Sequence, residues 1–180
     1  MIPFPDPLHP ATVHFPIAFL LLGAAMAVMA VFVRRWNLPL FAAVLLVAGA
    51  AGAVVAVNTG KEEEERVEHA VRAAESLLEN HERWGENARN AGIVAALLAT
   101  IAVYFARKPG FTGRVFSVLS ALAALSAAYC VLQAAHLGGQ LVYRHGAGVT
   151  VGKPATAGAP WESPGLPGRG GDEQEEEEEQ

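Results

Sequence analysis

Histidine is the residue type in this chain that is best suited to binding chemistry, and its six copies fall into three pairs along the sequence. In chain order the pairs are His9 and His14, His69 and His81, and His136 and His145. Imidazole is the commonest metal ligand in proteins, and histidines on facing helices of a bundle can hold iron or haem. The question is therefore which elements bring these side chains together.

Four long apolar runs lie between the histidine pairs, at residues 15–33, 39–57, 91–106 and 115–135. Each run is close to the roughly 17–25 residues that a helix needs to cross a bilayer. Their Ala, Leu and Val content does not alternate as in a β-barrel, and no polar residue recurs at every third or fourth position, as a soluble bundle requires. The sequence therefore predicts an all-α fold, an integral membrane bundle of four helices.

With four crossings, the three histidine-bearing segments emerge on one face of the membrane. His14, His81 and His136 fall near one depth and belong to three different helices. They predict a shared cofactor or divalent-metal site, with His9 or His145 available for a second pair. The alternative is that these histidines simply tolerate the membrane interface, and the residues leave both interpretations open.

Other candidates lie at the end of the fourth run. Gly138 and Gly139 either end the helix through a left-handed cap or let a ligand approach the backbone. Tyr143 and Arg144 suit an interfacial anchor, or a contact with an anionic group such as a haem propionate. In the second run, Gly49 begins a pattern of small residues that favours close helix packing over space for a flat cofactor.

The predicted organisation is a transmembrane domain at residues 1–151 followed by a tail at 152–180. The tail is rich in Pro and Gly and ends in glutamates, which predicts disorder. Residues 61–90 predict an outer amphipathic helix that leads into the third transmembrane helix, with a break at Gly85 as an option. The first helix begins at Pro16, or nearer Pro10 with a bend at Pro16. No internal repeat is evident in the sequence.

The positions of the basic residues predict the orientation of the bundle. Arg34 and Arg35 follow the first run, and Arg107, Lys108 and Arg114 lie between the third and fourth runs. Neither link contains an acidic residue. Both termini and all the histidines are therefore expected on the outer side of the membrane. The net charge of −5 reflects the glutamates of the tail.

Several classes of activity receive no support from the sequence. No Asp, Glu, Lys, Arg or His lies inside the four runs, although transporters and pumps usually need such groups there. The sequence has no phosphate-binding glycine loop and no nucleophile elbow, and Cys130 is the only cysteine. No enzyme activity is assigned, and a nucleic-acid partner is not expected.

Two stretches resemble the hallmarks of a family of bacterial membrane proteins known as domain of unknown function 2231. They are the segments His9–Ala18, which reads HPATVHFPIA, and Gly138–Gly146, which reads GGQLVYRHG, with His81 as an outer-loop histidine. The resemblance covers about residues 5–151. It implies a multi-pass protein of the bacterial inner membrane, with both termini expected in the periplasm, and no settled activity.

The family's layout is in turn similar to that of small membrane b-type cytochromes. That similarity implies a b-type haem near the outer face and a role in electron transfer, with a quinone or a periplasmic c-type cytochrome as partner. A scaffold or assembly subunit is the alternative, in which the acidic tail recruits a basic protein. A divalent-metal site at His14, His81 and His136 is the third interpretation.

Overall fold

The computed structural model describes residues 8–33, 37–67, 74–106 and 111–147, which belong to one compact unit. All of its regular structure is helical. A short first helix is followed by four long ones: α1 (His9–Thr12), α2 (His14–Phe32), α3 (Leu38–Val67), α4 (Glu75–Ala106) and α5 (Thr112–His145). The tail at 152–180 lies outside the described residues.

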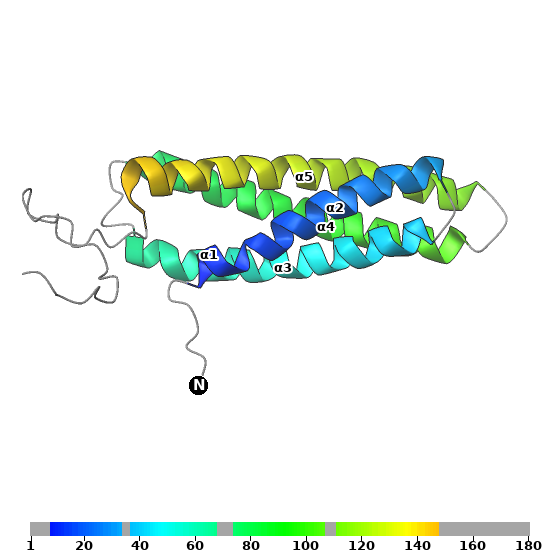
Figure 1. Ribbon diagram of the computed structural model, residues 1–180, viewed down its shortest axis with the longest axis horizontal. Coiled ribbons are helices and arrows are strands. Elements are labelled where there is room, and N and C mark those ends of the chain that lie inside the picture. The colour runs from blue at the N-terminus through cyan, green and yellow to red at the C-terminus, as the bar shows by residue number, and fades with distance from the viewer. Residues whose placement is uncertain (1–7, 34–36, 68–73, 107–110, 148–180) are drawn as a thin grey trace, which may run out of the picture. The chain divides into compact units, whose positions relative to one another are not determined.

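The four long helices form an antiparallel bundle (Figure 1). Each of α2 and α4 packs against both α3 and α5, while α1 packs against α3. The starts of α2 and α4 and the ends of α3 and α5 therefore lie at one end of the bundle. That end also carries the histidines, as the even number of crossings predicted.

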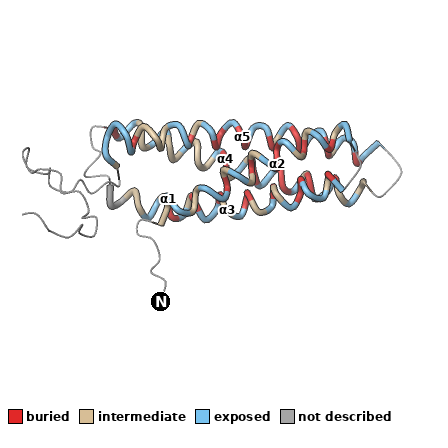
Figure 2. The backbone as a smooth tube through the Cα atoms, in the orientation of Figure 1, coloured by how far each residue is buried: buried red, intermediate tan, exposed pale blue. Residues whose placement is uncertain are grey.

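The interior of the bundle consists mainly of small residues, and its large apolar side chains point outward. Alanines dominate the buried core, whereas Phe32, Leu97 and Leu122 are 81%, 60% and 60% exposed. Figure 2 shows buried positions where the helices face one another and exposed positions on the outer sides. Small residues let membrane helices pack closely while large apolar ones face lipid, so this pattern is that of a membrane protein.

Four helical stretches are long and apolar enough to cross a membrane, namely His9–Phe32, Leu38–Glu64, Glu75–Ala106 and Thr112–His145. The prediction of an all-helical membrane bundle is confirmed. At 1.5 Å per residue, α5 with its 34 residues is about 50 Å long. It exceeds a hydrocarbon core of about 30 Å, so the helices continue well beyond the apolar runs that the sequence showed.

The bundle contains an internal repeat that the sequence did not reveal. Every buried residue of α2 has a buried counterpart in α4, 72 positions later, as His81 follows His9. The α2 set is Pro16, Leu20, Gly23, Ala24, Ala27 and Ala30, and the α4 set is Ala88, Gly92, Ala95, Ala96, Ala99 and Ala102. The buried positions of α3 between Ala42 and Ala56 likewise correspond to buried positions of α5 that lie 78 residues later, so that Ala56 corresponds to Ala134. The α2–α3 and α4–α5 hairpins are thus parallel repeats.

The first membrane helix begins near Pro10, which was one of the two predicted options. The short α1 starts at His9 with Pro10 in its first turn, where a proline is tolerated. Pro16 has no N–H to donate to the carbonyl of Thr12, and its ring crowds that carbonyl. The regular helix is interrupted at Val13, just before Pro16, as a result.

In the outer segments one expectation was wrong, and the structure decides between the two options at Gly138 and Gly139. Residues 61–90 do not form one amphipathic helix, because α3 continues to Val67 and α4 begins at Glu75 and passes unbroken through Gly85. The Gly138–Gly139 pair does not end the last helix. That helix ends at His145, and the left-handed cap is Gly146, with φ of 68°.

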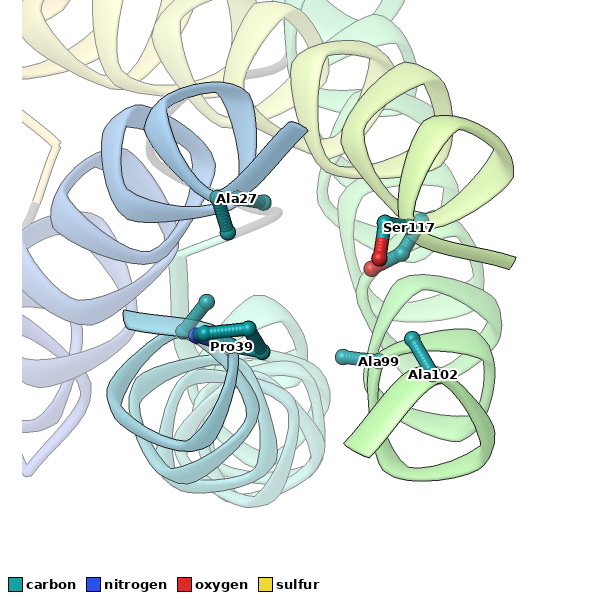
Figure 3. A pocket seen from close by; sticks show the side chains of 8 residues that line it. Ala27, Pro39, Ala99, Ala102 and Ser117 are labelled. Carbon is teal, nitrogen blue, oxygen red and sulfur yellow. The ribbon is translucent and has the colours of Figure 1, made fainter. Parts of the chain in front are cut away.

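The end of the bundle opposite the histidines is tightly packed. Figure 3 shows a small pocket there, into which Ala27, Pro39 and Ala99 point from three helices. Its volume is only about 10 Å³, which is close to the minimum for a single water molecule. The hydroxyl of Ser120 crosses from α5 to α4 by donating to the carbonyl of Ala95 at 3.1 Å. Space for a larger ligand therefore has to be sought at the histidine end.

Candidate functional site

A cavity of about 510 Å³ occupies the histidine end, and α1, α2, α3, α4 and α5 all contribute to its walls. The walls are mostly apolar, with Val13, Ile17, Ala53, Ala88 and Val131 among the lining residues. Polar side chains are also part of its lining, among them His9, His14, Lys61, Glu63, Glu64, His81, Glu82 and Tyr143. An apolar pocket of this size with a few convergent polar groups is the usual form of a ligand site.

His9 is held by the end of α3. Its Nδ1 donates to the carbonyl of Ala56 at 2.9 Å and lies 3.4 Å from the hydroxyl of Thr59. That hydroxyl also lies 3.1 Å from the hydroxyl of Thr12, one turn along from His9. A Cβ atom at Gly60 would come within 3.1 Å of Cε1 of the imidazole. The half-buried ring is thus fixed by one carbonyl and by the missing side chain of a glycine.

His81 is held in the same way by α5. Its Nδ1 donates to the carbonyl of Ala134 at 2.9 Å. A Cβ atom at Gly138 would lie 3.0 Å from Cε1 of this imidazole. Gly138 therefore does allow a close approach to the backbone, and the group that approaches is the His81 side chain of α4.

The two imidazole rings face one another across the bundle. Their centroids are 6.1 Å apart and their planes are nearly perpendicular, at 88°. A carbonyl can only accept a hydrogen bond, so the Nδ1 atom of each ring carries the proton. In the neutral ring Nε2 then has the free lone pair, and it is the nitrogen available to a ligand.

An ion-paired cluster beside the cavity joins α3 to α4, and two of its members, Lys61 and Glu82, are lining residues. The amine of Lys61 lies 2.9 Å from a carboxylate oxygen of Glu86 and 3.5 Å from one of Glu82. Arg89 extends the cluster at 4.0 Å from Glu86. These groups are partly exposed, and ion pairs of this kind contribute little to stability on their own. Their effect is to hold the two helices in register beside the cavity.

The remaining predicted site residues are dispersed. His14 and Gly139 line the cavity, and Tyr143, which is 91% exposed, also contributes to its wall. His136 and Arg144 are exposed, and both hydrogen-bond to the side chain of Gln140, at 2.8 and 3.4 Å.

His145 is the exposed last residue of α5. Like His136 and Arg144, it is not among the lining residues.

The expected trio of His14, His81 and His136 is not brought together. Within the described part of the chain, no three His, Cys, Asp or Glu side chains are placed so that they could hold a metal ion. His14 and His81 both line the cavity and His136 does not, and the ring whose centroid lies 6.1 Å from that of His81 belongs to His9. His69 lies outside the described residues.

The residues that fix the rings were missed at the sequence level. Ala56, Gly60 and Ala134 lie within or just after apolar runs and carry no chemistry of their own. An alanine followed four residues later by a glycine occurs at Ala56 and again at Ala134, 78 positions on, but the same spacing occurs at Ala48 and Ala88, so it does not single out these residues. A spacing of four residues places the alanine carbonyl and the glycine, which has no side chain, on one helix face about one turn apart.

Comparisons with known proteins agree with the membrane fold. Residues 5–151 match the family described as "Predicted membrane protein (DUF2231)". No curated protein matches the chain, and no solved structure does. The matched region contains every helix of the bundle and both histidines of the facing pair, so the chain belongs to the DUF2231 family of membrane proteins.

Proposed function

We propose that this protein holds a b-type haem between His9 and His81 and serves electron transfer at the outer side of the membrane. The observation that carries the proposal is the facing pair of imidazoles, with ring centroids 6.1 Å apart and each Nδ1 engaged by a backbone carbonyl. Metal-bound histidines characteristically donate their second ring nitrogen in this way, which fixes the ring and raises its basicity.

The distance between the rings suits two ligands of one metal. Ligating imidazole nitrogens lie about 2 Å from the metal, so two of them on opposite sides would have centroids roughly 6 Å apart. The observed 6.1 Å is in this range.

The number of donors favours haem over a bare ion. A structural zinc ion takes four protein ligands, and the described residues offer two imidazoles without a third group in reach. Haem brings the four equatorial nitrogens itself and needs only axial ligands from the protein. Two histidines are therefore sufficient for haem and insufficient for zinc.

The cavity supports the same assignment. Its volume of about 510 Å³ and its largely apolar wall suit a flat hydrophobic cofactor. Lys61 and Tyr143 also belong to the lining, where an ammonium and a phenol can bind carboxylate groups such as propionates. The haem would supply one-electron chemistry, and ligation by two histidines leaves no open position for oxygen chemistry.

The side of the membrane and the partner are part of this proposal. The basic residues near Arg34 and Lys108 in the sequence favour an orientation with the histidine end outside. A single haem near that end does not span the bilayer, so electrons would arrive from and leave to partners on one side. A membrane quinone and a periplasmic c-type cytochrome are the chemically suitable partners.

The test is the visible spectrum of detergent-purified protein, expressed with a supply of haem, before and after reduction with dithionite. A sharp reduced α-band is expected in the wild type, and it should be lost in His9→Ala and in His81→Ala. His136→Ala and His145→Ala are matched controls outside the cavity lining and should keep it. Retention of the full spectrum in both cavity variants would overturn the proposal, as would a featureless spectrum from folded wild-type protein.

A further inference from the structure

The histidine site is built twice from the same three parts. His9, Ala56 and Gly60 form one set, and His81, Ala134 and Gly138 form the other. In each set the alanine carbonyl accepts from Nδ1 at 2.9 Å. The glycine follows that alanine by one helical turn and packs against Cε1 of the same ring. Each hairpin of the internal repeat therefore carries one complete set.

The glycines of the two sets differ from the others in what they contact. A Cβ at Gly23 or Gly49 would meet a leucine of a neighbouring helix, and one at Gly139 would meet nothing within 4 Å. Among the glycines that the structure describes, those with an imidazole as nearest neighbour are Gly60 and Gly138. At 3.0–3.1 Å, an added Cβ would require the ring itself to move.

We infer that Gly60 and Gly138 are positioning residues that, with the carbonyls of Ala56 and Ala134, set both imidazoles as equivalent ligands. Each carbonyl favours the tautomer with the proton on Nδ1. Each glycine leaves space for the edge of the ring to pack against the helix backbone. The Nε2 lone pairs are thereby available before any ligand binds. The positions of the two rings and of their protons are properties of the haem-free protein, and their link to haem rests on the proposed function.

The first experiment reads the rings without haem. Nitrogen-15 NMR of histidine-labelled, haem-free protein in detergent distinguishes a protonated Nδ1 from a protonated Nε2. We expect two rings with the proton on Nδ1, whose signals disappear in His9→Gln and His81→Gln respectively. Signals from these two residues that show the proton on Nε2 would overturn the inference, whether or not the protein binds haem.

The second experiment changes the glycines. Gly60→Ala and Gly138→Ala should each displace one ring by a few tenths of an ångström, seen as a changed chemical shift of its Nδ1–H signal in the haem-free protein. In haem-loaded protein the same variants should shift the low-spin electron paramagnetic resonance spectrum and the midpoint potential. Gly139→Ala and Gly85→Ala are matched controls, because a Cβ at these positions meets open space or an atom no nearer than 4.0 Å.

The outcomes separate the two ideas. If wild-type protein binds no haem but shows two Nδ1-protonated rings that the glycine variants disturb, the positioning role stands and the proposed function fails. If haem binds and the glycine variants leave both the NMR and the resonance spectra unchanged, the positioning role is refuted and the function stands. If a glycine variant does not fold, the ring forms in wild-type protein still decide the inference.

Discussion

Leu20 lies in the core of the bundle, and its replacement by alanine tests how much the packing of large side chains against small ones stabilises the fold in lipid. Its side chain is completely buried. Its Cδ2 atom would lie 3.0 Å from a Cβ at Gly49 and 3.1 Å from one at Gly92, so it fills the space that these two glycines leave open.

The expected cost follows from separating two contributions. Replacing a buried leucine by alanine in a soluble protein lowers the free energy of unfolding by about 2.7–5.0 kcal/mol. About 2.4 kcal/mol of this is the free energy of transfer from water of the three carbons removed, at about 0.8 kcal/mol per carbon. In a bilayer that transfer contribution is absent, because lipid is as apolar as the leucine side chain. The remaining cavity contribution is about 0.3–2.6 kcal/mol.

The assay is reversible unfolding in mixed micelles, with Leu22→Ala as the control because Leu22 is 53% exposed to surrounding lipid. We expect Leu20→Ala to lower the free energy of unfolding by the cavity contribution and Leu22→Ala to leave it almost unchanged. Gly92→Ala should destabilise the wild type, yet stabilise Leu20→Ala by filling part of the cavity. Equal effects of the two leucine variants, or additive effects of Leu20→Ala and Gly92→Ala, would refute this account of the core.

Three further predictions concern packing, capping and orientation. Ala95→Leu, at a position with no exposed surface, should overpack the bundle by at least about 1–3 kcal/mol, measured as a lower free energy of unfolding in micelles. Gly146→Ala should cost about 1 kcal/mol because of the left-handed backbone there, measured by the same unfolding. In a Cys130→Ala background, Arg144→Cys should react with an impermeant maleimide in intact cells, and Thr112→Cys only after permeabilisation; the reverse would contradict the proposed orientation.

The sequence predicted the four helices because apolar runs of bilayer length leave few alternatives. It did not predict how far α3 and α5 extend, since the polar residues after Val57 and Ala135 do not interrupt a helix once tertiary packing continues. For the same reason the sequence left open whether Gly138 and Gly139 end the last helix, and the cap is in fact Gly146. Charge and hydropathy define which residues are in the membrane, but they do not define where a packed helix ends.

The cavity lies at the end of the bundle where the histidines were expected, but the two rings that approach each other are those of His9 and His81 rather than two from the trio His14, His81 and His136. Helices that are apolar all round do not reveal which side faces inward, so the depth of His14 and His136 could be estimated but not their direction. The side of each helix that faces the core is instead the one that carries the small residues. Their pattern repeats between the two hairpins, and that repeat was not recognised in the sequence. His9 was available as a candidate, and its role follows only once α1 is known to begin there.

The internal repeat also has a consequence for how the two hairpins recognise each other. Leu20 in the first hairpin corresponds to Gly92 in the second, and the two positions meet at the centre of the bundle. Two copies of the first hairpin would bring one Leu20 against another, whereas two copies of the second would leave a hole between glycines. The two hairpins are therefore complementary in shape at this point, and pairing of unlike hairpins is favoured over pairing of like ones.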